Sequence, residues 1–247
     1  SWALLGGLHA EGLEDVPIVF AELTQRAGNF LVGRTPDPDF QWTDLVGQTI
    51  IGGREGGMPE LVLEYVLKKN GLDPEKDLTI ITNLDLSATA SAFVAGTGAY
   101  TTEFEPGATT LEEGDNGYVV ASLGVDSGYV PYTVYMTTES ILEEKEDLMQ
   151  GFTNAIYKGQ KWVEEHTSEE VAEVIHPQFE ETSVETLTKI IERYQKQDTW
   201  KTDPVFSEES LRLIEDILRE GGEYEGELAY EAIANTSLAE KAMESVS

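Results

Sequence analysis

The sequence predicts an α/β fold whose strands form a mostly parallel sheet. Through residue 138, short apolar runs with strand character alternate with helical segments, at the spacing that is typical of βαβ units. A glycine-rich strand, turn and helix at 49–67 has the form of one such unit. After Thr138 the pattern changes to consecutive helices, so a mixed first part is followed by a helical second part.

The expected strands are short runs rich in β-branched and aromatic residues, each bounded by proline, glycine or polar residues. Their ranges are 17–21, 30–32, 49–51, 78–81, 99–104, 118–122 and 129–136. Helices are expected after Pro59, at 87–94 and in a short segment that ends at Leu111. Residues 1–12 are ambiguous, although their apolar side chains fit one helical face.

The second half has start signals for each of its later helices. We expect helices at 141–166, 168–175, 183–196 and 207–220, and a short helical tail. Ser168 with Glu170, Ser183 and Ser207 are the predicted N-caps, because a serine hydroxyl can accept from the free N–H groups of the first turn.

The glycine-rich turn is the first candidate ligand site. Glycines at 52, 53, 56 and 57 precede a helix whose first turn holds Pro59 and Glu60. Free backbone N–H groups at Gly56, Gly57 and Met58 would let a ligand approach closely. A tight turn without a ligand is the equal alternative. The spacing excludes both a Walker loop and the G-x-G-x-x-G dinucleotide fingerprint.

Charge and composition limit the partners. The 247 residues include 47 acidic and 16 basic side chains, so the formal net charge is 16 − 47 = −31. This chain is too acidic for a nucleic-acid binder, which needs a basic surface, and its charge also argues against docking on anionic lipid. There is no cysteine, no apolar run long enough for a membrane span and no opening signal peptide, so we expect a cytosolic or a trimmed exported protein.

Catalytic and metal motifs are not found. The three histidines, His9, His166 and His176, lack metal-ligand spacing, and no G-x-S-x-G elbow is present. Acidic residues are too numerous for one pair to stand out as an acid–base pair. We therefore expect a protein that is not an enzyme and that uses no cofactor and no metal.

Glu105 is a second candidate because of its position. It ends the strand at 99–104, and ligand sites of α/β folds lie beyond the carboxyl ends of strands. The alternative is a surface carboxylate that caps the next helix. Four aromatic residues are either ligand-stacking groups or core, namely Tyr129, Tyr132, Trp42 and Trp200.

Four segments in a fixed order give a family resemblance: DLVGQT…GGREGGMPELVLEYVLKKNGL, GTGAYTTEFEP, SLGVDSGYVPYTVY and FTNAIYKGQKWV. From about Val16 onward, the chain resembles the substrate-binding proteins of ABC importers. The most similar branch is the one related to thiamin-pyrimidine synthases, which also includes binders of nitrate and sulfonates. The resemblance implies a two-lobed periplasmic-binding-protein-like fold of type II, with the ligand in a cleft.

The resemblance also implies the domain bounds and the contacts. Lobe I would comprise 1–28 and 133–247 and lobe II 29–132, with crossings near 23–30 and 130–135. Family members begin with further strand–helix units that are absent here, so lobe I is expected to lack its N-terminal part. Either the chain is a fragment or its lobe I is incomplete, and a missing segment is expected to matter for binding and stability. The implied ligand contacts are Thr24, Gln25, Gly56, Gly57, Met58, Glu105, Ser127, Tyr129 and Tyr132.

The function implied is the capture of a solute outside the cytoplasm, in the periplasm or at the bacterial cell surface, for an ABC permease with its ATPase. A lipid anchor outside this chain would be its only membrane contact. A carboxylate at position 105 would repel an anion and attract a donor-rich group, so a heteroaromatic ligand of thiamin or thiamin-precursor type is expected. The alternatives are a binder of nitrate, sulfonate or taurine, an enzyme similar to pyrimidine synthases, and a sensory or structural module that has lost its transporter.

Overall fold

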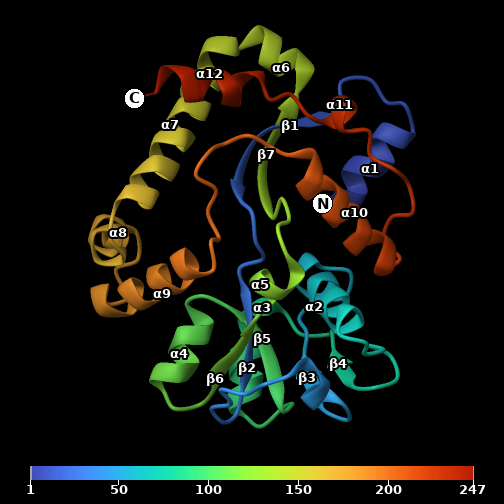
Figure 1. The fold of residues 1–247 in the computed structure, drawn as a ribbon, viewed down its shortest axis with the longest axis vertical. Coiled ribbons are helices and arrows are strands. Elements are labelled where there is room, and N and C mark those ends of the chain that lie inside the picture. Colours follow the sequence, from blue (N-terminus) through green and yellow to red (C-terminus); the bar gives the residue numbers. More distant parts are fainter. Residues whose placement is uncertain (1, 247) are drawn as a thin grey trace. The chain divides into compact units, whose positions relative to one another are not determined.

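The computed structural model describes residues 2–246 and separates into two compact units (Figure 1). Unit 2 is Ala27–Gly128, and unit 1 combines residues 1–26 with 129–247. The chain thus enters unit 2 after Arg26 and leaves it before Tyr129. The bounds expected for lobe II were 29 and 132.

Unit 2 is built on one mixed sheet with the strand order β4-β3-β5-β2-β6. Its strands are β2 (Asn29–Gly33), β3 (Thr49–Ile51), β4 (Thr79–Ile81), β5 (Tyr100–Phe104) and β6 (Tyr118–Ser122). The helices of this unit are α2 (Met58–Lys69), α3 (Leu86–Val94), α4 (Gly107–Glu113) and α5 (Leu123–Ser127), with a 3₁₀ turn at Trp42–Leu45.

The expectation of a mostly parallel sheet is wrong because of β2. Strand β3 pairs in parallel with β4 and β5, and helices α2 and α3 connect these strands as predicted for βαβ units. Strand β2 pairs antiparallel with both β5 and β6. It follows directly on unit 1, with no crossover helix, and inserts between two strands that come later in the chain. The local sequence pattern of a strand does not specify which distant strands it pairs with.

The core of unit 2 lies between the sheet and its helices. Ile50 and Ile51 of β3 and Leu63 of α2 are fully buried. Gly52 is required at the end of β3, since a Cβ there would lie 2.4 Å from Cγ2 of Ile80. This close packing fixes the turn that leads into α2.

Unit 1 contains the antiparallel pair β1 (Pro17–Thr24) and β7 (Thr133–Thr138). The strand expected at 129–136 begins later, because Pro131 has no N–H to donate. The backbone N–H groups of Val130 and Tyr132 instead donate to Gln25 and Thr24. The register of the pair shifts between Glu22 and Thr24, and such bulges change the direction of side chains.

The loop that precedes α10 (Glu208–Glu220) runs along the other edge of β1. Its contacts are backbone hydrogen bonds: Lys201 N to Leu23 O at 3.0 Å, and Glu22 N to Pro204 O at 2.9 Å. Thr24 also forms an antiparallel bridge with Trp200. Residues distant in sequence are therefore held beside the end of β1.

The other helices of unit 1 are α1 (Trp2–Ala10), α6 (Glu139–Glu144), α7 (Glu146–Glu165), α8 (Ser168–Ile175), α9 (Val184–Lys196), α11 (Tyr230–Ile233) and α12 (Ser237–Ser245). The expectation of a single helix at 141–166 is wrong. The helix is interrupted at Lys145, which has φ −129° and ψ 34°, so α6 and α7 are separate helices. The N-caps Ser183 and Ser207 are confirmed. Ser168 is not a cap; Thr167 forms a capping box with Glu170 instead.

Helix α10 is the best-buried helix of unit 1. Leu211 and Ile214 are fully buried, and Phe206, just before the helix, stacks on Trp2 with ring centroids 5.7 Å apart. The buried Glu215 carboxylate accepts from Arg212 and from the Leu228 backbone N–H. These contacts fix the N-terminal end of α10, which is where the candidate site lies.

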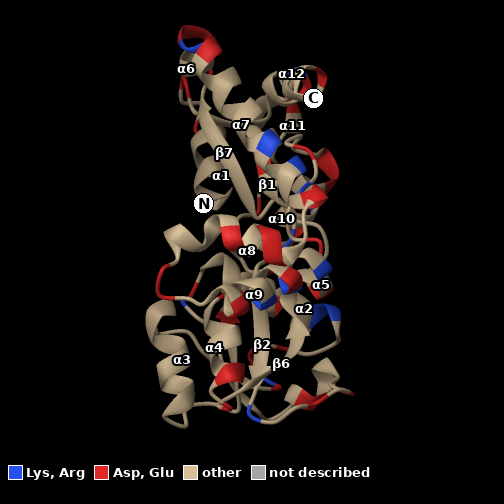
Figure 2. Cartoon of the chain, turned by 90° about the vertical axis from the view of Figure 1, so that its left-hand side faces the viewer, with Lys and Arg blue, Asp and Glu red and all other residues tan. Residues whose placement is uncertain are grey.

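Acidic residues recur along the helices of unit 1, with a group at α6 (Figure 2). Most of these carboxylates are exposed, as expected for a highly charged, solvated surface. None of the helices within residues 2–246 is both long enough and apolar enough to cross a bilayer.

Candidate functional site

The glycine turn before α2 is closed by a side chain of its own helix. The Gly56 N–H donates to Oε2 of Glu60 at 3.3 Å, and the Gly57 N–H donates to the Arg54 carbonyl at 3.0 Å. The N–H groups expected to be free at Gly56 and Gly57 are thus occupied, and Met58 is the first residue of the helix. An anion at this turn would have to displace the Glu60 carboxylate.

Glu60 itself has an unusual environment. Its side chain is buried, and this burial raises the pKa of the carboxyl to about 7, with a further contribution from Glu64. The hydrogen bond from Gly56 acts in the opposite direction. The sequence indicated only a favourable helix-dipole position for Glu60; its burial depends on the packing of the whole turn.

Glu105 caps α4. Its Oε2 accepts from the Thr109 N–H and its Oε1 from the Thr109 hydroxyl, both at 2.9 Å. This is the alternative that the sequence left open, and a role of Glu105 in ligand binding stays a prediction. Ser127 lies in α5 and is buried, and its hydroxyl has no hydrogen-bond partner within residues 2–246.

In unit 1 the structure brings Gln25 and Tyr129 together at Asp198. The Gln25 amide donates to the Asp198 carbonyl at 3.2 Å, and the Tyr129 hydroxyl donates to Oδ2 of Asp198 at 2.8 Å. The Arg26 guanidinium lies over the Tyr129 ring, 4.0 Å from its centroid. Tyr129 is 48% exposed, so part of its ring is available for a ligand.

Thr24 and Tyr132 are less accessible. The Tyr132 N–H donates to the Thr24 carbonyl at 3.1 Å, and the Thr24 hydroxyl is buried, with no hydrogen-bond partner in the described part of the chain. Burial raises the pKa of the Tyr132 phenol, with a smaller contribution from Tyr194. These two residues support the backbone at the end of β1.

A hollow of about 150 Å³ opens beside Gln25 and Tyr129; we call it the Glu22 hollow. It is lined by Glu22, Gln25, Tyr129, Lys201, Ser207, Glu209 and Ser210. Its volume is below the roughly 300–1,000 Å³ of whole-ligand pockets, so it would accept one functional group of a ligand. The predicted residues Gln25 and Tyr129 thus share a hollow with residues that the sequence analysis missed.

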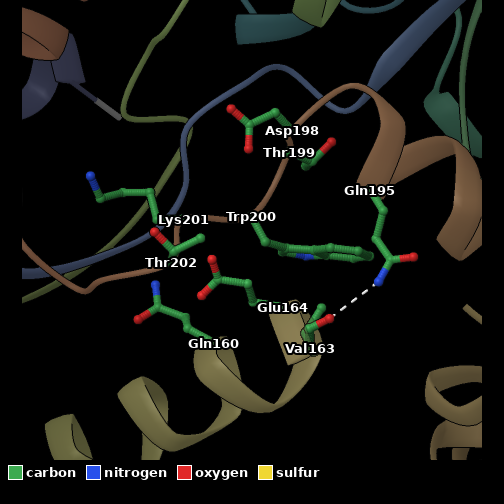
Figure 3. A pocket seen from close by; sticks show the side chains of 9 residues that line it. All are labelled: Gln160, Val163, Glu164, Gln195, Asp198, Thr199, Trp200, Lys201 and Thr202. Carbon is green, nitrogen blue, oxygen red and sulfur yellow. Dashed lines mark hydrogen bonds between the residues drawn. The ribbon is translucent and has the colours of Figure 1, made fainter. Parts of the chain in front are cut away.

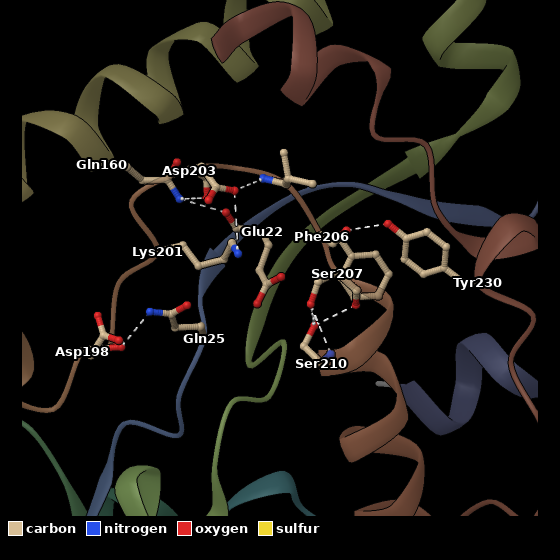
Figure 4. Close-up of polar contacts among 11 residues, drawn as sticks. Glu22, Gln25, Gln160, Asp198, Lys201, Asp203, Phe206, Ser207, Ser210 and Tyr230 are labelled. Carbon is tan, nitrogen blue, oxygen red and sulfur yellow. Dashed lines mark hydrogen bonds and ion pairs between the residues drawn. The ribbon is translucent and has the colours of Figure 1, made fainter.

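Glu22 is the most unusual of these residues. Its exposed fraction is 1%, and neither carboxylate oxygen has a hydrogen-bond partner among the described residues. Burial raises the pKa of the carboxyl to about 7. Lys201 and the nearby backbone N–H of Ser207 lower this pKa, but their effect is smaller than that of burial. Asp203 adds to the increase. Figure 4 shows the carboxylate pointing toward the space between Lys201, Ser207 and Gln25.

The surroundings of Glu22 are held in place by the loop before α10. The Gln160 amide donates to the carbonyls of Glu22 and Asp203, at 2.9 and 3.2 Å. Ser207 caps α10 by accepting from the Ser210 N–H at 3.2 Å, so the positive end of the helix dipole lies at the hollow. Lys201 is 13% exposed and lies 3.7 Å from Asp203.

Sequence reasoning missed Glu22 because it placed the end of the strand at Ala21, whereas β1 continues to Thr24. A carboxylate inside an otherwise apolar strand is a signal that could have been found. Lys201 and Ser210 carry no comparable local signal.

A second hollow of about 280 Å³ surrounds Trp200 (Figure 3). It is lined by Gln160, Val163, Glu164, Gln195, Asp198, Thr199, Trp200, Lys201 and Thr202. Two residues connect this hollow with the Glu22 hollow. Lys201 lines both, and the carbonyl of Asp198 accepts from Gln25, which lines the Glu22 hollow. Trp200 also packs edge-on against Tyr194, with ring centroids 5.6 Å apart, so its ring also contributes to side-chain packing in unit 1.

These groups can bind a polar ligand. Within residues 2–246, no set of three or more histidine and acidic side chains is placed to hold a metal ion. The hollow supplies a carboxylate, an ammonium, hydroxyls and an amide, which are groups for hydrogen bonding and charge recognition.

Comparison with known proteins gives the family. The model of the NMT1-like family matches residues 47–176. “Putative binding protein YtlA” of Bacillus subtilis (strain 168) is 42% identical over 234 residues, covering 95% of this chain and 70% of the relative. The chain belongs to the NMT1-like family.

Solved structures agree with this NMT1-like fold. The ligand-binding component of an ABC-type import system from Staphylococcus aureus, with zinc bound, has a TM-score of 0.71 and 14% identity, covering 98% of this chain and 78% of that one. The periplasmic aliphatic sulphonate binding protein SsuA of Escherichia coli has a TM-score of 0.62 and 16% identity, covering 92% and 70%. The two-lobed fold that the resemblance to substrate-binding proteins of ABC importers implied is confirmed.

The desulfurization enzyme DSZB has a similar fold, with a TM-score of 0.65, 13% identity and coverage of 97% of this chain and 83% of that one. The fold of NMT1-like proteins therefore carries catalysis as well as binding, and the function of this chain depends on its own site residues.

Proposed function

We propose that this chain is the solute-binding component of an ABC importer and that it binds without chemical turnover. The observation that carries the proposal is the Glu22 hollow, where Gln25, Tyr129 and a buried carboxylate face one small polar space. No nucleophile–base pair occurs among its lining residues. Its groups favour recognition by hydrogen bonds and by the Tyr129 ring.

The partners follow from the family. An ABC permease with its ATPase would receive the ligand, and the protein would work outside the cytoplasm. The ligand we propose is a small donor-bearing heteroaromatic molecule of thiamin-precursor type. Two residues of the hollow support a ligand of this kind. Tyr129 has a partly exposed ring beside the Arg26 guanidinium, and the Glu22 carboxylate is a hydrogen-bond acceptor.

A small anion is the second candidate. Lys201 and the N-terminal end of α10 both attract negative charge at the same hollow. Against it stand the Glu22 carboxylate, Glu209 and the net charge of −31. The Glu60 side chain also occupies the glycine turn where an anion was expected as an alternative.

The first test identifies what the protein carries. Purified protein is denatured, and the small molecules that it releases are analysed by mass spectrometry. We expect one donor-bearing molecule, present in proportion to the protein. The same molecule is then added back to ligand-free protein, where calorimetry should show binding at one site.

Prolonged incubation of that mixture should return the molecule unchanged. A product that forms only with protein present would contradict the binding function, and boiled protein is the control for spontaneous breakdown. Absence of any bound molecule, together with no binding in a broad screen, would equally contradict it.

A further inference from the structure

Glu22 is positioned to determine which ligands are accepted. A buried ionised group without a partner destabilises a folded protein, so its presence needs a compensating contact. Among the described residues, neither of its oxygens has a hydrogen-bond partner. The oxygens are themselves buried, and the Glu22 side chain lines a hollow that opens to solvent. The nearest cation, Lys201, forms its ion pair with Asp203.

We infer that Glu22 is the specificity-determining acceptor of this site and selects a ligand group with positive charge or paired N–H donors. Aminopyrimidine, amidinium and ammonium groups meet this description. Such a group fits a hollow of about 150 Å³, and two adjacent N–H donors match the two oxygens of a carboxylate. The inference rests on the proposed solute-binding function.

The other groups at the hollow fit the same ligand. The Gln25 amide already donates to Asp198, which leaves its side-chain oxygen as a further acceptor. The Ser207 and Ser210 hydroxyls bond to each other at 3.0 Å and cap α10. Glu209 adds a second negative charge at the rim.

A pH dependence of binding distinguishes Glu22 from a purely structural residue. Besides Glu22, the ionisable groups facing this carboxyl are Lys201 and Asp203 of the loop, Glu209 of α10 and Tyr230 of α11. Burial raises the pKa of the Tyr230 phenol above its ordinary value, so this group stays neutral between pH 5.5 and 8. Because burial raises the pKa of Glu22 to about 7 and the ionised carboxylate is the acceptor, affinity for a donor-bearing ligand should rise between pH 5.5 and 8.

The experiment uses the full chain and probes of two classes. Thermal unfolding is measured with 4-aminopyrimidine, methylammonium and guanidinium as donor probes, and with nitrate and methanesulfonate as anions. We expect at least one donor probe to raise the melting temperature of the wild type at pH 8. Glu22→Gln should reduce the affinity for that probe at least tenfold and remove its pH dependence.

Two further variants complete the design. Glu103→Gln removes another buried carboxyl, one held by the Thr89 and Thr101 hydroxyls in unit 2, and should leave binding unchanged. Lys201→Met removes the competing cation and should strengthen binding of the donor probe. Far-UV circular dichroism of each variant confirms that it is folded.

The inference is overturned if no donor probe stabilises the wild type, if Glu22→Gln binds the probe as tightly as the wild type, or if only anions bind. In the last two cases a ligand still binds, so the solute-binding function survives while the assignment of Glu22 fails. If neither class binds and no molecule is released on denaturation, the proposed function itself fails.

Discussion

Phe206→Ala is expected to lower the free energy of unfolding of unit 1 by about 3–5 kcal/mol, the usual cost of deleting a fully buried phenylalanine. Phe206 is 1% exposed and packs between the rings of Trp2 and Tyr230, with centroid distances of 5.7 and 5.4 Å. Its backbone carbonyl also accepts from the Tyr230 hydroxyl. The effect is large because removing a fully buried ring leaves a cavity that the surrounding structure fills only in part.

The loss is measured by urea unfolding, followed by circular dichroism. Phe179→Ala is the matched control, because Phe179 is 50% exposed and its removal should change stability by less than about 0.5 kcal/mol. A loss below about 1 kcal/mol for Phe206→Ala would show that the cluster relaxes freely. Because Phe206 directly precedes Ser207, we also expect weaker ligand binding in this variant.

The second large effect is a dependence of stability on pH that is due to Glu22. Its pKa is about 7 in the folded protein, against 4.5 as the ordinary value. Between these two values the folded state holds the proton more tightly than the unfolded state. Stability therefore falls as pH rises from 4.5 to 7, by about 3 kcal/mol at about 1.4 kcal/mol per pKa unit, and changes no further above that range.

Urea unfolding of ligand-free wild type and Glu22→Gln at pH 5 and pH 8 tests this. The wild type should lose more stability than the variant on going to pH 8, because glutamine does not ionise. Glu169→Gln, an exposed position on α8, serves as the control and should follow the wild type. The same pH slope in wild type and Glu22→Gln would mean that Glu22 is solvated in the ligand-free protein.

A donor-bearing ligand should reverse part of this loss. Its positive group would replace the missing partner of the ionised Glu22, so the stabilisation by ligand should be greater at pH 8 than at pH 5. The pH dependence of stability and that of binding thus come from the same carboxyl.

The sequence determined the local structure of this protein to a large extent. Apolar runs gave the positions of β1 to β6, and the serines at 183 and 207 gave two helix starts, because strand pattern and N-capping depend on neighbouring residues. The ordered motifs also gave the family and the two-lobed fold. Gln25 and Tyr129 were named as site residues on that basis, and the structure places them beside one hollow.

The tertiary structure alone decided the chemistry of the site. Glu22 is buried beside residues about 180 positions later in the chain, because the loop of Lys201 and Pro204 pairs along β1 and the start of α10 lines the same hollow. Likewise, the Glu60 carboxylate accepts from the Gly56 N–H of the glycine turn, and the Glu105 carboxylate accepts from Thr109 in the first turn of α4. Burial and the position of a charge relative to its neighbours set a pKa, and long-range packing determines both.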